Sequence, residues 1–198
     1  MSGQRYLLIA CVLGAGASRR MGTNKLSLRS RNHVSFLHQV IDRMIKSDVE
    51  SMVLFDNMQT AGAYLDLPES IERQTIPNGE FSATVRAAIE YAQSKNASHV
   101  MIALGDMPEV TTQDINALVV ASKNQADAFV CATYKGRVGN PVILPLLNSK
   151  KWIADISGDS GARGILKSHH GPMIEVECGP GVILDIDTPQ DYDDYLRT

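Results

Sequence analysis

Apolar residues occur in two kinds of run along this chain, and the two kinds alternate. Short continuous runs are typical of strands that are covered on both faces, as in a parallel sheet. These runs predict strands at 6–13, 49–55, 71–76, 99–104, 126–133, 173–178 and 182–186. Longer runs repeat apolar residues at intervals of three and four, which is the spacing of an amphipathic helix. They predict helices at 33–46, 81–94 and 111–123, a short helix within 158–169, and a last helix that begins near Thr188 and Pro189.

The order of these elements predicts the fold class. Strands alternate with helices over the first two-thirds of the chain, which indicates an α/β fold with a mostly parallel central sheet. Thr111 or Thr112 is placed to cap the third helix, with Asp114 in its first turn. After residue 126 the alternation ends, and the segment 135–141 is rich in turn residues and is expected to be a loop. The sequence has no repeat, low-complexity tract or linker, so we expect residues 1–198 to form one domain.

The composition narrows the class of protein. Hydrophobic residues make up 44% and charged residues 21% of the 198 positions, which is ordinary for a globular protein. A net charge of -3 provides no basic field for nucleic acid.

The cysteines and the N-terminal segment bear on the compartment. Cys11, Cys131 and Cys178 lie in apolar runs and form no CxxC pair, so we expect buried thiols in a reducing compartment. The apolar run near the N-terminus is too short to span a membrane and lacks the order of a signal peptide, which predicts a cytoplasmic protein with no membrane partner.

A glycine-rich loop follows the first predicted strand directly. It reads Leu13-Gly14-Ala15-Gly16-Ala17-Ser18-Arg19-Arg20-Met21-Gly22-Thr23-Asn24-Lys25. At the carboxyl end of a parallel strand, such glycines let backbone N–H groups approach phosphate oxygens, and Arg19 and Lys25 add positive charge. A dinucleotide fingerprint would need glycine in place of Arg19, and a P-loop would need Lys-Ser or Lys-Thr directly after Gly22. The loop therefore predicts a phosphate site of another kind, and the alternative is a glycine-rich turn stabilised by surface arginines.

Acidic residues stand at the ends of two other predicted strands. Asp106 follows the strand 99–104, and a carboxylate there faces the same crevice as the glycine-rich loop. Asp185 and Asp187 alternate on an extended segment, so their side chains point to one face. Three such carboxylates suit a divalent metal that holds phosphates. The alternatives are that Asp106 belongs to a turn and that one of the other two caps the last helix.

Together these segments resemble the molybdenum cofactor nucleotidyltransferase family, that is, the molybdopterin cytidylyl- and guanylyltransferases. The loop is similar to the family signature Leu-x-x-Gly-x-Ser-x-Arg-Met-Gly-x-x-Lys, a motif that sugar-nucleotide pyrophosphorylases share. The resemblance continues in order through residues 79–86, 105–108, 139–141, 158–163 and 185–189. It covers nearly the whole chain, and the Asn-Pro and Gly-Asp-x-Gly-Ala-Arg segments make it much more specific than the loop alone.

The resemblance implies a Rossmann-like three-layer α/β/α nucleotidyltransferase fold and dependence on Mg²⁺. It implies transfer of CMP or GMP, from CTP or GTP, to the terminal phosphate of molybdopterin with release of pyrophosphate, the product passing to a molybdoenzyme or its chaperone. The residues that it implies at the nucleotide are Leu13, Gly14, Ala15, Gly16, Ser18, Arg19, Lys25, Gly79, Ser82 and Asp106, of which Arg19, Lys25 and Asp106 would be catalytic. Asp106 and Asp185 would hold the metal, with Asp187 as a further candidate. Asn140, Asp159 and Arg163 would lie on the acceptor side, formed by roughly residues 126–180.

Two departures from the family pattern bear on the substrates. Ala15 stands in Gly14-Ala15-Gly16, where the cytidylyl branch usually has Ala-Ala-Gly and the guanylyl branch ends in Gly-Gly, so Ala15 favours CTP. Phe81 stands where the cytidylyl branch tends to have Met within Gly-Met-Ser, which leaves GTP open. Two alternative functions remain: a sugar-1-phosphate nucleotidyltransferase, for which the chain is short, and a non-catalytic nucleotide-binding regulator, which would lack the carboxylates of Asp106 and Asp185.

Overall fold

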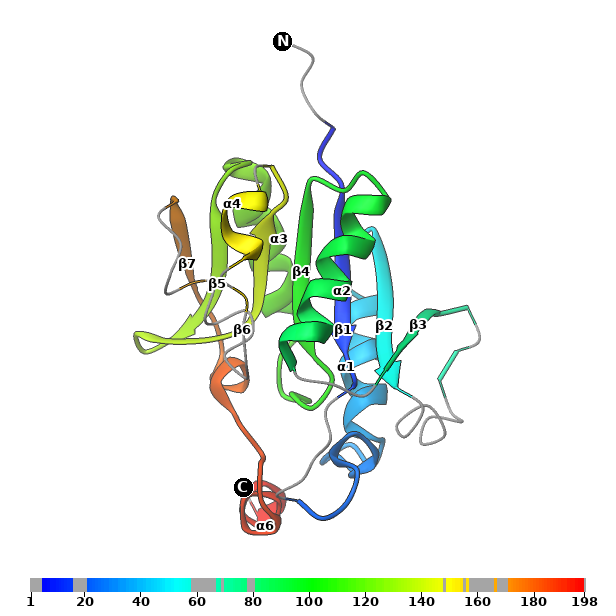
Figure 1. Cartoon of the computed structure of the whole chain (residues 1–198). Helices are drawn as coiled ribbons and strands as arrows, with labels where there is room; N and C mark the ends of the chain where they lie inside the picture. Colours follow the sequence, from blue (N-terminus) through cyan, green and yellow to red (C-terminus); the bar gives the residue numbers. More distant parts are fainter. Residues whose placement is uncertain are drawn as a thin grey trace.

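The computed structural model describes residues 5–15, 21–57, 67–68, 70–77, 81–147, 149–154, 156, 166 and 171–197. Within them the strands are β1 (Leu8–Leu13), β2 (Ser51–Asn57), β3 (Glu72–Ile76), β4 (His99–Leu104), β5 (Phe129–Tyr134), β6 (Arg137–Pro145) and β7 (Met173–Glu177). They form one sheet in the order β3-β2-β1-β4-β6-β5-β7 (Figure 1). β6 runs antiparallel to β4 and β5, and the other neighbours pair in parallel. The predicted α/β fold with a mostly parallel sheet is confirmed.

The central strand β1 explains why the first apolar run is continuous. All six of its residues are buried. Successive side chains of a strand point to opposite faces, and here they divide between two core clusters, Leu8, Ala10 and Val12 in one and Ile9, Cys11 and Leu13 in the other. Both faces of the sheet therefore carry a hydrophobic core.

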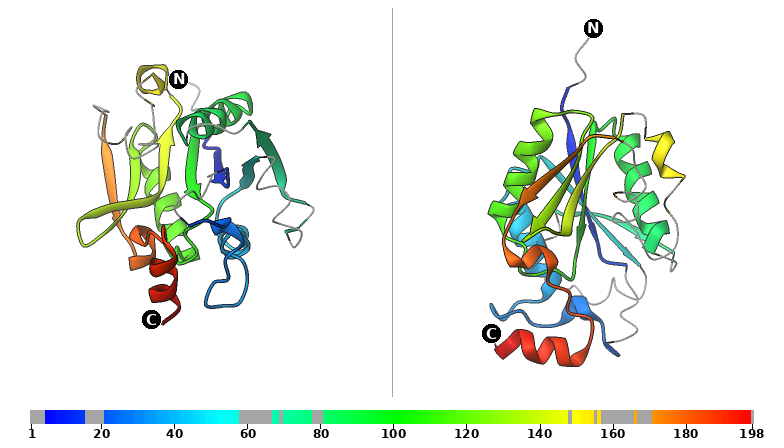
Figure 2. Two further views of the ribbon diagram at one scale, coloured as in Figure 1. Left: turned by 60° about the horizontal axis from the view of Figure 1, so that its bottom comes forward. Right: turned by 90° about the vertical axis from the view of Figure 1, so that its left-hand side faces the viewer.

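Helices cover the two faces of the sheet and complete three layers (Figure 2). On one face α1 (Phe36–Ile45) and α3 (Thr112–Asn124) contribute buried residues such as Leu37 and Ile115 to the first cluster. On the other face α2 (Phe81–Ser94) and the short α4 (Lys150–Ile153) contribute residues such as Ile89 and Trp152 to the second. Within the described ranges, no helix is both long enough and apolar enough to cross a membrane.

Helix ends follow local capping signals closely. Ser35 caps α1 by accepting a hydrogen bond from the N–H of His38 at 3.2 Å. Thr111 and Asp114 form a reciprocal capping box at the start of α3, so the predicted cap of this helix is confirmed. The last helix, α6 (Pro189–Arg197), begins where the sequence predicts it. The short helix expected within 158–169 falls outside the described residues, apart from Leu166.

Two expectations for the second half of the chain are wrong. The expected strand at 182–186 is instead the end of a 3₁₀ helix, η4 (Pro180–Ile183), followed by residues that belong to no helix or strand. Pro180 stands at the start of η4, where its fixed φ favours a helical turn. The expected loop at 135–141 is instead a tight turn and the beginning of β6. Lys135 and Gly136, with φ of 49° and 74°, make a two-residue turn, and Tyr134 and Arg137 pair on either side of it.

Candidate active site

The candidate active site lies at the carboxyl ends of β1 and β4. These strands pair in register up to Leu13 and Leu104, so they end side by side. The N–H of Gly105 donates to the carbonyl of Leu13 at 3.0 Å, and the N–H of Gly14 donates to the carbonyl of Phe55 on β2 at 2.7 Å. The beginning of the glycine-rich loop and the turn that carries Asp106 are therefore neighbours, as expected from a parallel sheet.

Lys25 is held in place by the short helix η1 (Lys25–Ser27). The Asn24 side chain caps η1 by accepting a hydrogen bond from the N–H of Leu26 at 3.1 Å, and Leu26 is buried in the core beneath. The side chain of Lys25 is only 11% exposed. Its Nζ donates to Asp106 Oδ2 at 2.8 Å and to Asp187 Oδ1 at 2.7 Å. One cation thus joins two carboxylates that come from distant segments of the chain.

Opposing effects act on the pKa of Lys25. Burial, the largest of them, lowers this pKa because it disfavours the charged ammonium. The carboxylate of Asp106, and after it that of Asp187, favour the ammonium through charge and hydrogen bonding. The net result is a pKa above the ordinary 10.5. Lys25 is therefore a permanent positive charge at neutral pH, suited to binding phosphate oxygens.

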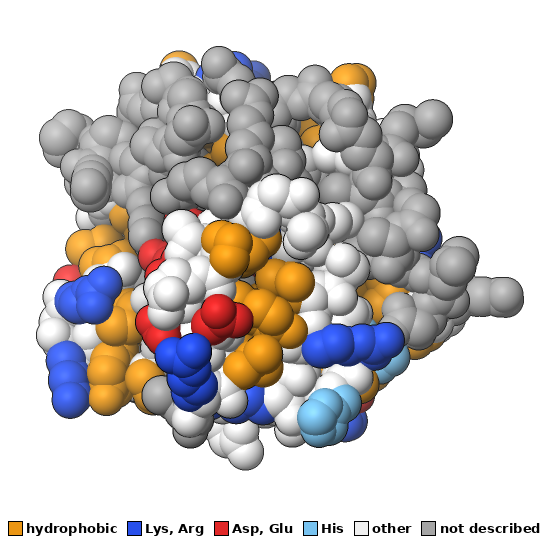
Figure 3. Space-filling model, turned by 90° about the horizontal axis from the view of Figure 1, so that it is seen from below, with side chains coloured by type: hydrophobic (Ala, Val, Ile, Leu, Met, Phe, Trp, Pro, Cys, Tyr) orange, Lys and Arg blue, Asp and Glu red, His pale blue; other side chains and the backbone are white. Residues whose placement is uncertain are grey.

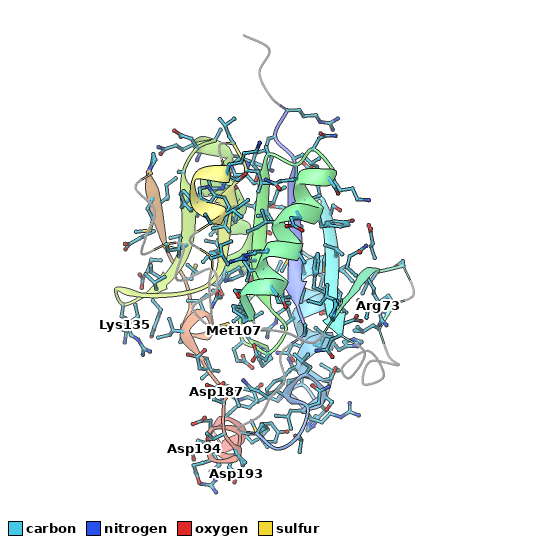
Figure 4. All side chains as sticks on the ribbon, in the orientation of Figure 1. Arg73, Met107, Lys135, Asp187, Asp193 and Asp194 are labelled. Atoms are coloured by element: carbon cyan, nitrogen blue, oxygen red, sulfur yellow. The ribbon has the colours of Figure 1, made fainter. Side chains whose placement is uncertain are left out.

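The segment before α6 decides which aspartate reaches Lys25. Ile186 is 1% exposed and packs in a small cluster with Met21, Phe36 and Tyr195. Asp187, which follows it, forms the ion pair with Lys25, whereas Asp185 is exposed. Asp187 lies on the segment that leads into α6 (Figure 4). The described side chains include no group of three or more His, Cys, Asp or Glu residues that could hold a metal ion. The structure therefore brings together Asp106 and Asp187, and not the three carboxylates of the sequence-based hypothesis.

A cavity of about 130 Å³ opens beside this charged group. Its walls come from the strand ends, the glycine-rich loop and the first turn of α2, namely Leu13, Ala15, Lys25, Leu26, Phe81, Thr84, Leu104 and Asp106. Seen from the side on which β1 ends, acidic and basic side chains lie together next to apolar ones (Figure 3). The sequence analysis considered Phe81 only for the choice between CTP and GTP, and it did not include Phe81 or Thr84 among the expected site residues. Their signal is a spacing of three residues at the start of a helix, which puts both side chains on one face.

The other expected site residues divide into those that the structure describes and those that lie outside the described residues. Ser82 lies in the first turn of α2 and is 4% exposed, and Asn140 on β6 is 5% exposed. Asn140 borders a small apolar cavity with Leu104 and Met107, so it lies close to the turn that carries Asp106. Gly16, Ser18, Arg19, Gly79, Asp159 and Arg163 lie outside the described residues.

Comparison with known proteins identifies the family. The family model described as "MobA-like NTP transferase domain" matches residues 10–173 of this chain. The chain belongs to the MobA-like NTP transferase family. The curated protein "Purine catabolism protein PucB" of Bacillus subtilis (strain 168) is 28% identical over 203 residues, which is 96% of each chain.

Solved structures share the fold of this MobA-like NTP transferase. The crystal structure of Rv0371c from Mycobacterium tuberculosis H37Rv superposes with a TM-score of 0.81 at 22% identity, covering 97% of this chain and 99% of the other. A structure of Rv0371c in complex with manganese gives a TM-score of 0.79 at 20% identity, with coverage of 97% and 99%. At these identities the likeness concerns the fold.

The residues that the family model matches include only part of the charged group formed by Lys25, Asp106 and Asp187. The matched residues include the described part of the glycine-rich loop, Lys25 and Asp106, but they end before Asp187. In this MobA-like NTP transferase, the second carboxylate on Lys25 therefore comes from the segment that follows the matched domain.

Proposed function

We propose that this protein transfers CMP from CTP to the terminal phosphate of molybdopterin, in the free pterin or the molybdenum cofactor, and releases pyrophosphate. The observation that carries the proposal is the meeting of Lys25, Asp106 and Asp187 at the mouth of the cavity formed with the glycine-rich loop. Family membership supports the nucleotidyltransferase chemistry. The choice of CMP over GMP rests on Ala15, which lines this cavity.

The two carboxylates fit a divalent metal. One oxygen of Asp106 and one of Asp187 both lie within hydrogen-bonding distance of the same nitrogen, so these oxygens converge on a small volume. Carboxylate oxygens are the ligands that Mg²⁺ prefers, and Mg²⁺ is usually held by one or two carboxylates together with substrate phosphates. A relative of the same fold is known as a manganese complex. When bound here, Mg²⁺ would supply positive charge to the α- and β-phosphates.

The residues of the chain would act mainly by positioning and by charge. The acceptor phosphate oxygen attacks the α-phosphorus in line with the departing pyrophosphate, and because the acceptor is already an anion, no strong general base is needed. Lys25 would neutralise the charge that grows on the departing pyrophosphate. Arg19 assists from the same loop. Asp106 and Asp187 would hold the metal, with Asp185 as the further candidate.

The rest of the proposal concerns the acceptor. We assign the acceptor side to roughly residues 126–180, within a single domain of residues 1–198, with Asn140, Asp159 and Arg163 toward the pterin. We likewise assign Gly79 and Ser82 to the binding of the base and ribose. The product passes to a molybdoenzyme or its chaperone in the cytoplasm, with no nucleic acid or membrane partner.

Pyrophosphate release tests this function directly. The protein is incubated with Mg²⁺, molybdopterin and either CTP or GTP, and in parallel arms with each triphosphate and a sugar 1-phosphate. We expect release with CTP and molybdopterin, and none without Mg²⁺. Release with GTP and molybdopterin, but not with CTP and molybdopterin, would move the assignment to the guanylyl branch. Release only in the sugar 1-phosphate arms would replace molybdopterin as the acceptor, and nucleotide binding with no release in any arm would favour a regulator.

A further inference from the structure

Asp191, in the first turn of α6, binds the backbone of Asp187. Its Oδ2 accepts a hydrogen bond from the N–H of Thr188 at 2.8 Å and another from the N–H of Asp187 at 3.0 Å. The N–H of Asp191 in turn donates to Thr188 Oγ1 at 3.2 Å. The two bonds with Thr188 make a capping box, which the helix needs for its own N-terminus. The bond to Asp187 lies outside the capping box and fixes the residue whose carboxylate reaches Lys25.

The helix that carries Asp191 is itself firmly attached. Tyr195 is 3% exposed and packs edge-on against Phe36, with ring centroids 5.6 Å apart. Its hydroxyl donates to Glu109 Oε1 at 2.7 Å and accepts a hydrogen bond from the N–H of Arg31 at 3.1 Å. Glu109 follows Asp106 by three residues. The same helix is therefore tied to the turn that carries the other carboxylate of the site.

We propose that Asp191 is a positioning residue, which holds the peptide N–H of Asp187 so that the Asp187 carboxylate stays beside Asp106 at the metal and triphosphate site. The inference rests on the proposed function. The residues between Ile186 and α6 belong to no helix or strand, so the hydrogen bond that the N–H of Asp187 donates to Asp191 replaces the restraint that a sheet would supply. Groups that orient metal ligands in this way typically change metal affinity by about 10–100-fold when they are removed.

The test separates positioning from helix capping by two matched variants. Asp191→Ala removes the bond to Asp187 together with part of the capping box, whereas Thr188→Ala removes only the capping hydroxyl and leaves both N–H bonds to Asp191. Asp191→Asn is the conservative variant, because one amide oxygen can accept both N–H bonds. The affinity for Mn²⁺ in the presence of CTP, without an acceptor, is measured by electron paramagnetic resonance, and the melting temperature is measured in parallel.

We expect Asp191→Ala to weaken Mn²⁺ binding about tenfold or more, because the restraint on Asp187 is lost. Asp191→Asn should bind Mn²⁺ within about threefold of the wild type, because its amide oxygen keeps that restraint. Thr188→Ala should lower the melting temperature by about 2–4 °C, as loss of one cap does, with Mn²⁺ affinity close to that of the wild type. Equal losses of Mn²⁺ affinity in Asp191→Ala and Thr188→Ala, or a tenfold loss in Asp191→Asn, would overturn the proposal. Because no acceptor is present, a wrong acceptor assignment would change pyrophosphate release and leave this comparison intact.

Discussion

Lys25 and Asp187 are separated by 162 positions in the chain, and yet Lys25 Nζ lies 2.7 Å from Asp187 Oδ1. Lys25 stands in the first loop after β1, and Asp187 stands just before the last helix. The packing of Ile186 against Phe36 and Tyr195 brings the two segments together. In the proposed function the C-terminal helix therefore contributes to the nucleotide site, because its attachment determines where the second carboxylate lies.

The two neighbouring aspartates of this segment should differ sharply in their importance. Asp187→Asn removes a carboxylate charge that would hold the metal in the proposed function, and loss of one charge-assisted contact of this kind typically costs about 2–4 kcal/mol, or about 10²–10³ in rate. Asp185→Asn changes an exposed side chain and should keep the rate within about threefold, as surface substitutions usually do. Steady-state pyrophosphate release checks both variants. A larger loss in Asp185→Asn than in Asp187→Asn would show that Asp185 is the functional carboxylate.

Asp106→Ala should abolish turnover while the fold remains intact. The side chain of Asp106 is 31% exposed at a turn, so its removal leaves the hydrophobic core unchanged. It takes away one of the two carboxylates on Lys25 and, in the proposed function, a metal ligand. Circular dichroism and the melting temperature establish folding, and pyrophosphate release measures activity. Near-normal activity in the folded variant would refute the metal assignment.

Gly139 should be nearly irreplaceable, whereas Gly136 should tolerate asparagine. A Cβ at Gly139 would lie 2.0 Å from the carbonyl oxygen of Val182, so Gly139→Ala forces the backbones of β6 and η4 apart. Overpacking of this kind costs about 1–3 kcal/mol or more, and each kcal/mol lowers the melting temperature of a chain of this size by about 2–4 °C. A Cβ at Gly136 would meet nothing within 4 Å, and its φ of 74° suits asparagine.

Thermal unfolding of Gly139→Ala and Gly136→Asn, side by side, checks this difference. Gly136→Asn should unfold only slightly below the wild-type temperature, because asparagine adopts the left-handed conformation more readily than other side chains do. Equal melting temperatures for the two variants would contradict the close approach of β6 and η4.

The three cysteines should be unreactive in the folded protein. Burial raises the pKa of Cys11, that of Cys131 to about 11 and that of Cys178 to about 12, the last also through the charge of Asp114. At pH 8 almost no thiolate is present, and the thiolate is the reactive form. A disulfide-exchange reagent at this pH should modify none of the thiols within minutes, and should modify three per chain in guanidinium chloride.

The raised pKa values of these thiols predict how the stability of the folded protein changes with pH. Their pKa values in the folded protein lie above the ordinary 9.0. Above that pH the unfolded chain loses protons that the folded chain keeps, so the stabilisation from the neutral buried thiols is complete below about pH 9 and declines as pH rises further. Denaturant titrations at pH 8 and pH 10 measure the change. Rapid modification of Cys11 or Cys131 in the folded protein at pH 8 would contradict their burial, and rapid modification of Cys178, which is half-buried, would contradict its raised pKa.

Local signals in the sequence determined much of the fold. The apolar run of β1 predicted a strand covered on both faces because each of its side chains enters one of two cores. Thr111 and Asp114 predicted the start of α3 because a capping box is complete within four residues. The position of Asp106 near the glycine-rich loop followed from the rule that parallel strands end at one edge of the sheet.

Other features were decided only by contacts between distant segments. The residues at 182–186 have the apolar pattern of a strand, but Pro180 starts a 3₁₀ helix before them and the backbone of Val182 approaches Gly139 closely, so they form the end of η4 and a connection outside any strand. The alternation of side chains on an extended segment predicted that Asp185 and Asp187 point to one face, but it did not indicate which of them approaches Lys25. The choice of Asp187 as the partner of Lys25 depends on Ile186, which is fixed by packing against residues about 150 positions earlier in the chain. Hydrophobic patterning is a property of neighbours in sequence, whereas the position of this carboxylate depends on how the C-terminal helix packs against the rest of the molecule.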